Sequence, residues 1–242
     1  MTSIRAVLFD KDGTLFDFKA SWGQWTQRYL AQLAGGDDMK RRELANAVGF
    51  DIDRRRFESD SPIIAGTPDE IAEVLLPHLP SEGREGLLLS MNRATMQAEM
   101  VEAAPLRPLL RGLRARGLTL GVATNDAEEP ARAHLKAADV EEYFDYLVGF
   151  DSGYGAKPAA GMCTGFSEQI GVPADEIVMV GDSRHDLLAG RAAGMRTVAV
   201  LTGIAQEDSL APLAEVVLPH IGHLPAWLEG VSPAEKFERT AV

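Results

Sequence analysis

The stretch that most constrains this chain is residues 4–15, IRAVLFDKDGTL. Its apolar run from Ala6 to Phe9 is typical of a strand buried on both faces, and it ends abruptly in Asp10, followed by Asp12 and Gly13. Open α/β sheets place their ligand crevice outside the carboxyl ends of the strands, so two carboxylates at this point favour a functional site. An ordinary Asp-Gly turn is the alternative, and residues 10–15, DKDGTL, do not by themselves decide between a turn and a functional site.

The two carboxylates also indicate a chemistry. Asp10 and Asp12 lie two residues apart, so at strand spacing they project to one side, while Gly13 permits a sharp reversal of the chain. Two like charges this close require a cation, and oxygen ligands of this kind suit Mg2+. A carboxylate beside Mg2+ can attack phosphorus to form an aspartyl-phosphate, and a second carboxylic acid can protonate the leaving oxygen and then deprotonate water.

Charge and cysteine content exclude several classes of partner and site. The net charge of −12 leaves no broad basic surface for nucleic acid or an acidic membrane, whereas a small phosphorylated metabolite needs only one local cation. Cys163 is the only cysteine, which excludes an intramolecular disulfide and a cysteine-based zinc site. No apolar run is long enough to cross a bilayer, and the first strand starts too early for a signal peptide, so we expect a cytoplasmic protein. Oligomeric state is not indicated.

Residues 17–104 have the pattern of a helical insertion. Apolar and aromatic residues recur there at three- and four-residue spacings, and Thr67-Pro68 with Glu70 forms the signature of a capped helix start. Nothing in this range resembles a strand. We therefore expect an inserted all-helical domain at 17–104, with helices at 16–34, 37–48, from 67 onward and at 82–103.

The rest of the chain predicts a doubly wound α/β core made of residues 1–16 and 105–230. Apolar segments alternate with helical patterns, which implies a mostly parallel sheet with helices on both faces. Residues 231–242 are expected to be a C-terminal tail. Strands after the first are expected at residues 118–123, 146–150, 177–180, 197–201 and 214–218.

Further polar residues follow these strands, and right-handed winding would gather them at one edge of the sheet. Thr124 and Asn125 lie at a strand-to-helix junction, where free backbone N–H groups favour a phosphate, although a plain helix cap is the alternative. Lys157 lies in a Gly-containing loop and could neutralise both the nucleophile and the phosphoryl group. A solvated surface lysine is the alternative there.

Two more aspartates complete the set of candidates. Asp182 directly follows the strand at 177–180 and is a candidate metal ligand, with Asp186 in support, directly or through water. Ser183 and Asp186 also fit an acidic variant of the capping box, so helix capping and metal support both stay open for Asp186.

Taken together, these segments resemble a known family. In order and spacing, DKDGTL at 10–15, Thr124, Lys157-Pro158 and GDSRHD at 181–186 are similar to the four motifs of the haloacid dehalogenase-like superfamily. The resemblance covers residues 4–15 and 105–225, and it implies a Rossmann-like core. The helical insertion is similar to the C1 cap of that family.

The resemblance also implies roles for the residues. Asp10 would be the nucleophile and a metal ligand, and Asp12 the general acid/base, with its backbone carbonyl contacting Mg2+. Thr124 and Lys157 would hold the phosphoryl group. The metal site would be completed by Asp182, supported by Asp186.

The implied activity is that of a Mg2+-dependent phosphatase acting on a small phosphorylated metabolite. The layout is similar to phosphoglycolate phosphatase-like and β-phosphoglucomutase-like enzymes, which makes 2-phosphoglycolate a candidate substrate and a sugar phosphomutase the nearest alternative. A non-catalytic scaffold that binds a phosphometabolite is the remote alternative.

Two groups of residues in the insertion have alternative roles. Trp22 and Trp25 either line the pocket or form the cap core, and Arg54 to Arg56 either bind an anionic leaving group or are solvated.

Overall fold

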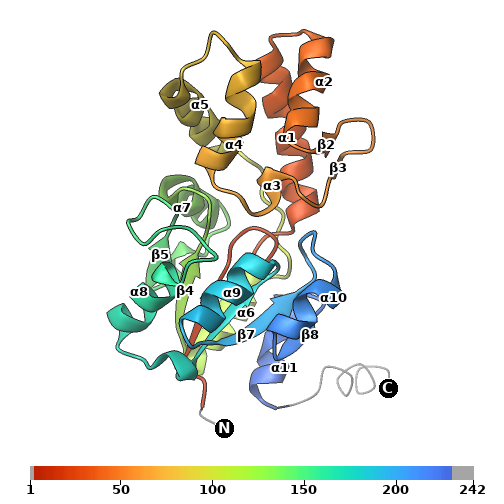
Figure 1. The fold of residues 1–242 in the computed structure, drawn as a ribbon. Coiled ribbons are helices and arrows are strands. Elements are labelled where there is room, and N and C mark those ends of the chain that lie inside the picture. Colours follow the sequence, from red (N-terminus) through yellow and green to blue (C-terminus); the bar gives the residue numbers. More distant parts are fainter. Residues whose placement is uncertain (1–2, 231–242) are drawn as a thin grey trace.

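The computed structural model describes residues 3–230 and shows a sheet with helices on both sides, below a mainly helical insertion (Figure 1). The sheet has six strands in the order β5-β4-β1-β6-β7-β8, and all neighbouring strands pair in parallel. The expected doubly wound parallel sheet is thereby confirmed. The strands are β1 (Ala6–Phe9), β4 (Thr119–Ala123), β5 (Tyr146–Val148), β6 (Ile177–Gly181), β7 (Arg196–Val200) and β8 (Val216–Leu218).

The central position of β1 determines where the site forms. Phe9, its last residue, pairs in register with Val122 of β4 and Val180 of β6. The three strands therefore end almost level, and the residues that follow them emerge side by side. Every residue of β1 is fully buried, which explains the continuous apolar run in its sequence.

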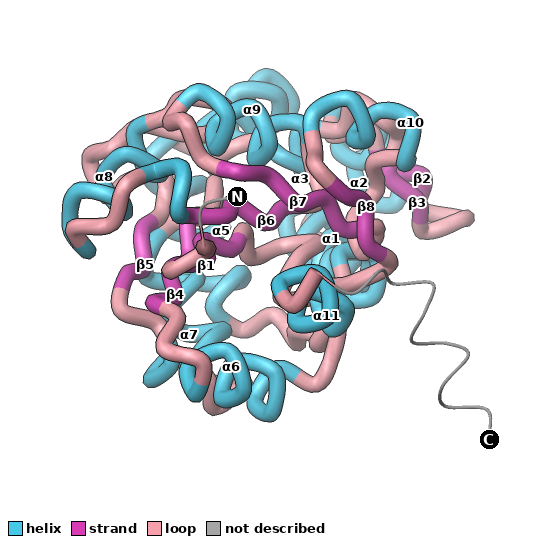
Figure 2. Tube along the Cα trace, turned by 90° about the horizontal axis from the view of Figure 1, so that it is seen from below, coloured by secondary structure: helices cyan, strands magenta, loops and turns pink. Residues whose placement is uncertain are grey.

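Helices cover both faces of the sheet (Figure 2). The core helices are α6 (Leu106–Ala115), α7 (Glu128–Ala137), α8 (Gly161–Ile170), α9 (Arg184–Ala192), α10 (Glu207–Leu210) and α11 (Leu224–Leu228). Side chains alternate along β1: Val7 and Phe9 pack into the cluster with α6, α7 and α11, whereas Ala6 and Leu8 pack into the cluster with α8 and α9.

The insertion has a buried cluster of its own, built from residues between Phe18 and Met91. Its helices are α1 (Phe18–Ala34), α2 (Asp38–Ala47), α3 (Pro62–Ala65), α4 (Pro68–Leu75) and α5 (Arg84–Met96). It is not all-helical as we expected, because β2 (Phe50–Asp51) and β3 (Arg56–Phe57) form an antiparallel hairpin. Strands of two residues are too short to show an alternating pattern in the sequence.

The last cap helix ends earlier than expected, at Met96 instead of near residue 103. After the helix, the chain returns to the core next to residues 15–17, where the chain first passes from the core into the cap. Asp17 N donates to Val101 O at 2.8 Å, and Ala103 N donates to Leu15 O at 2.9 Å. These bonds hold the two connections between cap and core side by side.

The division into core and cap at residues 16/17 and 104/105 stays a proposal, supported by the separate buried clusters. Within residues 3–230, no helix combines the length and apolar character needed to span a membrane. The expected tail, residues 231–242, lies outside the described residues.

The capping box of α4 gives a stability prediction. Glu70 N donates to Thr67 Oγ1, and Thr67 N donates to Glu70 Oε2 at 2.7 Å. We expect Thr67→Ala to lower the free energy of unfolding by about 1 kcal/mol, because it leaves a helix N–H without its partner. Thr67→Ser keeps the hydroxyl and should unfold close to the wild type in urea. Equal losses in the two variants would show that the methyl group matters and the cap does not.

Candidate active site

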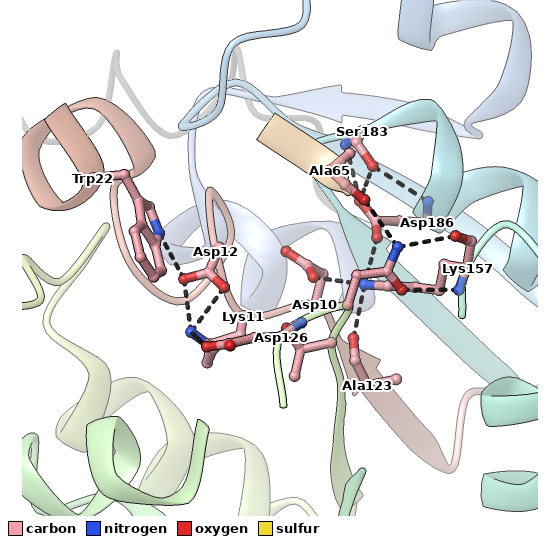
Figure 3. A network of polar contacts seen from close by, with 12 residues as sticks. Asp10, Lys11, Asp12, Trp22, Ala65, Ala123, Asp126, Lys157, Ser183 and Asp186 are labelled. Carbon is pink, nitrogen blue, oxygen red and sulfur yellow. Dashed lines mark hydrogen bonds and ion pairs between the residues drawn. The ribbon is translucent and has the colours of Figure 1, made fainter. Parts of the chain in front are cut away.

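The candidate residues come together at the carboxyl edge of the sheet, where Figure 3 shows Asp10, Lys157 and Asp186. Asp10 follows β1, Thr124 follows β4 and Asp182 follows β6, while Asp186 lies in the first turn of α9. Lys157 reaches the same place from the loop between β5 and α8. All five are buried, none more than 5% exposed. The parallel winding thus gathers residues that are far apart in the sequence.

Lys157 connects two of the aspartates. Its Nζ lies 2.6 Å from Asp10 Oδ1, 2.7 Å from Asp186 Oδ1 and 2.8 Å from the carbonyl oxygen of Ala123. Burial alone would lower the pKa of Lys157, but the charges of Asp10 and Asp186 raise it above its ordinary value. The ammonium group is therefore charged and held close to the candidate nucleophile.

Three carboxylates crowd around this ammonium. Oxygens of Asp10, Asp182 and Asp186 lie within 4.8 Å of one another. Burial, opposed by Lys157 and reinforced by Asp186 and Asp12, raises the pKa of Asp10 to about 7. Burial, together with Asp10 and Asp186, raises the pKa of Asp182 well above its ordinary value. Without a further cation, the negative charge of the cluster exceeds what one lysine can balance.

The cluster fits a divalent metal ion. Asp10 Oδ2 is buried and has no hydrogen-bond partner within residues 3–230. An all-oxygen carboxylate set is the type that Mg2+ prefers. The side chain of Asp12 does not belong to the cluster, and Figure 3 shows it beside Lys11 and Trp22 instead. The expected contact of its backbone carbonyl with the metal stays a prediction.

Two glycines hold Asp182 in place by their lack of a side chain. A Cβ at Gly203 would lie 1.6 Å from Asp182 Oδ2, and a Cβ at Gly13 would lie 2.4 Å from Asp182 Cγ. Gly13 also has a φ of 86°, which glycine adopts more readily than other residues. The backbone itself therefore forms the wall behind this candidate ligand.

Asp186 caps α9 and also reaches the carboxylate cluster. Its Oδ2 accepts from Ser183 N at 2.9 Å and from Ser183 Oγ at 2.7 Å, which completes a capping box on α9. Its Oδ1 faces Lys157 and the carboxylate cluster. The capping role is therefore observed, and the expected support of a metal ion stays a prediction.

Thr124 and Asn125 differ in how their side chains are engaged. Thr124 Oγ1 accepts from Asp126 N at 3.1 Å, and among residues 3–230 its hydroxyl hydrogen has no acceptor and can donate to a ligand. Asn125 Oδ1 accepts from Lys157 N, and its Nδ2 donates to Lys157 O and to Ala65 O of the cap, with all three distances between 2.8 and 2.9 Å. Asn125 thus positions the lysine loop and the cap, and its substrate-binding role stays a prediction.

Sequence reasoning missed a second buried cluster next to the first. Lys11 is fully buried, and its Nζ lies 2.7 Å from Asp12, 3.1 Å from Asp126 and 3.1 Å from His134. Burial and the charge of Lys11 lower the pKa of His134 to about 4. The available signal was the lysine between two aspartates at the end of an apolar strand, which is out of place unless it is paired.

A cavity lies between the cap and the carboxylates of the core, and the cap supplies its apolar wall. Trp22 and Trp25 belong to the buried cap cluster and also line the cavity, so both interpretations of these residues hold. The run Arg54 to Arg56 lies in the β2–β3 hairpin, is exposed, and does not line the cavity. The cavity wall contributed by the cap consists of Phe18, Trp22, Trp25, Ile63, Ile64, Ala65, Gly66, Pro68, Ile71, Met91 and Thr95.

Several known proteins are similar to this chain in sequence. A family model described as a haloacid dehalogenase-like hydrolase matches residues 4–194. A phosphoglycolate phosphatase of Rhodospirillum rubrum is 36% identical over 230 residues, covering 93% of this chain and 90% of the relative. A protein of Dickeya dadantii named "Probable phosphatase IndB" is 39% identical over 211 residues, covering 84% of each chain.

Solved structures share the fold. A predicted phosphoglycolate phosphatase of Haemophilus somnus superposes with a TM-score of 0.71 at 16% identity, over 94% of this chain and 99% of the other. A β-phosphoglucomutase of Clostridium difficile superposes with a TM-score of 0.64 at 20% identity, over 91% of this chain and 93% of the other.

The raised pKa of Asp10 gives a prediction for the metal-free protein. The folded state, with a pKa of about 7, binds the Asp10 proton more tightly than the unfolded chain, whose ordinary value is 3.8. Raising the pH from about 5 to about 7.5 should therefore destabilise the wild type relative to Asp10→Asn, by about 2 kcal/mol. Urea unfolding in EDTA at both pH values measures this difference.

The metal supplies the control for that measurement. At the higher pH, Mg2+ should stabilise the wild type much more than Asp10→Asn, because it neutralises the carboxylates. A stability difference between the two proteins that does not change with pH would contradict the assigned burial of the Asp10 charge.

Proposed function

Because the chain belongs to the haloacid dehalogenase-like hydrolase family, we propose that it is a Mg2+-dependent phosphatase acting through an aspartyl-phosphate on Asp10. The observation that carries the proposal is the buried Asp10 carboxylate, with one oxygen on Lys157 and the other without a partner in the described chain. Phosphatase names among the relatives support the same reaction class.

The first step forms a bond between an Asp10 carboxylate oxygen and phosphorus and breaks the bond from phosphorus to the leaving oxygen. The hydroxyl hydrogen of Thr124 can donate to a phosphoryl oxygen. Lys157 would bind a second phosphoryl oxygen by exchanging one of its contacts with Asp10, Asp186 and the carbonyl oxygen of Ala123. A Mg2+ ion held by Asp10, Asp182 and Asp186 would supply positive charge against the phosphoryl oxygens.

Asp12 carries the protons in this proposal. It lines the same cavity as Asp10, and its carboxylic acid form donates a proton to the leaving oxygen in the first step. Its carboxylate then takes a proton from the water that attacks phosphorus, and the bond between phosphorus and Asp10 breaks. The products are an alcohol and inorganic phosphate, and Asp10 is regenerated.

A sugar phosphomutase is the second candidate, and a β-phosphoglucomutase shares the fold of this chain. It would use the same residues but transfer the phosphoryl group to a sugar hydroxyl instead of water. The 20% identity of that neighbour supports the shared fold alone. Release of free phosphate distinguishes the two reactions.

The cap wall bears on the choice of ester. Among the described residues that line the cavity, the basic side chains are Lys157 and His185, and both come from the core. Lys157 already lies between Asp10 and Asp186. A carboxylate on the leaving group would lose its hydration against isoleucine and tryptophan with no cation from the cap to replace it. This wall favours an ester whose leaving group is uncharged and largely apolar.

The relatives' names instead make 2-phosphoglycolate a candidate substrate. The leaving group of this ester carries a carboxylate. 2-Phosphoglycolate can therefore be compared with an ester whose leaving group is uncharged. The two lines of support point to different esters, and the assay decides between them.

The reaction class is tested by phosphate release from a panel of phosphate monoesters, with Mg2+ or with EDTA. We expect release that requires the metal and falls by a factor of roughly 10⁴ or more in Asp10→Asn, because the amide cannot form the acyl phosphate. Met39→Leu on the exposed face of α2 is the matched control and should keep full activity. Phosphate transfer to a sugar without free phosphate would favour the mutase.

The character of the leaving group is tested by the ratio of kcat/KM for phenyl phosphate to that for 2-phosphoglycolate. We expect the wild type to favour phenyl phosphate, and Ile64→Arg to shift the ratio toward 2-phosphoglycolate by roughly tenfold, since it adds a cation to the wall. Met39→Arg adds the same charge on an exposed surface and should not move the ratio. A wild type that prefers 2-phosphoglycolate would contradict this assignment.

A further inference from the structure

Lys11 is a buried charge that the proposed mechanism does not use. Its side chain is fully buried, although it lies between Asp10 and Asp12 in the sequence. An ammonium group taken out of water without partners strongly destabilises a fold. The partners that it finds in the structure therefore indicate what it does.

The ammonium group has three partners, two held by hydrogen bonds and one by an ion pair. Lys11 Nζ lies 2.7 Å from Asp12 Oδ2, 3.1 Å from Asp126 Oδ2 and 3.1 Å from His134 Nδ1 (Figure 3 shows the two aspartates). Two carboxylates, those of Asp12 and Asp126, lie within 3.1 Å and compensate the burial of the ammonium charge. Lys11 is thus a charged donor that holds Asp12 and His134 by hydrogen bonds and Asp126 by an ion pair.

The third acceptor, His134, connects Lys11 to the cap. His134 Nε2 lies 2.7 Å from the carbonyl oxygen of Thr95, which can only accept, so Nε2 carries the proton. The ring is neutral because burial and the charge of Lys11 lower its pKa. Nδ1 must then accept from Lys11. The contact fixes the tautomer and orients the imidazole between the core and α5.

Asp12 makes the opposite connection. Trp22 Nε1, from α1 of the cap, donates to Asp12 Oδ1 at 2.9 Å. A continuous series of hydrogen bonds therefore leaves the cap at Trp22, passes through Asp12, Lys11 and His134 of the core, and re-enters the cap at Thr95. Lys11 lies at its centre.

We propose that Lys11 is a positioning residue that holds Asp12 in the orientation for proton transfer and ties that orientation to the closed cap. This inference rests on the acid/base role of Asp12 in the proposed function. Moving the cap away would remove the indole donor from Asp12 and the carbonyl acceptor from His134 together. The acid/base is then fully held only while the cap covers the cavity and excludes water.

The test separates proton transfer from general structural support. An alkyl phosphate needs a proton from Asp12 as its alkoxide leaves, whereas 4-nitrophenolate leaves without one. In Lys11→Met, kcat/KM for an alkyl phosphate should fall roughly 100-fold and kcat/KM for 4-nitrophenyl phosphate far less. Hydrolysis of the aspartyl-phosphate still needs Asp12, so 4-nitrophenyl phosphate should give a burst equal to the enzyme concentration, followed by slow turnover.

Lys136→Met is the matched control, since it makes the same substitution at an exposed site on the helix that carries His134. It should leave both esters unaffected. A pair of variants at His134 covers the case in which Lys11→Met does not fold. His134→Leu should show the same difference between the esters, and His134→Gln, which keeps a donor and an acceptor, should restore much of it. Equal losses on both esters in the folded variants would overturn the role of Lys11.

The rate of amide hydrogen exchange in the cap tests the link between Lys11 and the cap without depending on phosphatase activity. Lys11→Met should speed exchange at residues 92–98, where α5 meets His134, by tenfold or more, and Lys136→Met should not. A wild type without Mg2+-dependent release would overturn the phosphatase, while faster exchange would still support the tie to the cap. Unchanged exchange in an active enzyme would overturn the tie and leave the phosphatase standing.

Discussion

Repulsion between buried carboxylates is the constraint on which the rest of this structure depends. Five aspartates lie at one edge of the sheet, and two buried lysines divide them into neighbouring groups. Lys157 lies among the carboxylates around the candidate nucleophile, and Lys11 lies between the candidate acid/base and Asp126. Within residues 3–230, Asp10 of the first group keeps an oxygen without a hydrogen-bond partner, and the group has an excess of negative charge that a divalent cation would balance. The second group receives a neutral donor, Trp22, and a neutral acceptor, the Thr95 carbonyl, from the cap.

The sequence was sufficient for the parts of the site that depend on strand ends. Continuous apolar runs mark buried strands, and parallel winding brings whatever follows them to one edge, so Asp10, Thr124 and Asp182 could be placed together in advance. The β2–β3 hairpin could not be predicted, because strands of two residues leave no periodicity in the sequence. The end of α5 could not be predicted either, because it depends on where the chain rejoins the core. The contact between Lys11 and His134 joins positions 123 residues apart, so the sequence around Lys11 indicates a paired lysine but does not identify His134 as a partner.

The aromatic residues of α1 serve the cap and the site at once. Trp22 packs edge-on against Trp25 with ring centroids 5.0 Å apart, and Trp25 stacks on Tyr29 at 5.1 Å. This row of rings continues the buried cluster of the cap up to the cavity. The indole N–H that reaches Asp12 is therefore held by the same packing that folds the insertion. Cap stability and the environment of Asp12 cannot vary independently.

The glycines behind the carboxylates set limits on how this protein can be altered. A side chain at position 203 would overlap Asp182, and one at position 181 would lie 2.2 Å from Asp186 Cβ. Randomised libraries gain nothing at these positions, since every replacement displaces a carboxylate before it reaches the substrate. Ile63, Ile64 and Ile71 of the cap wall do not lie behind a carboxylate and are outside the capping box of α4. Directed evolution of substrate range therefore has its productive positions on the insertion, with the sheet edge left untouched.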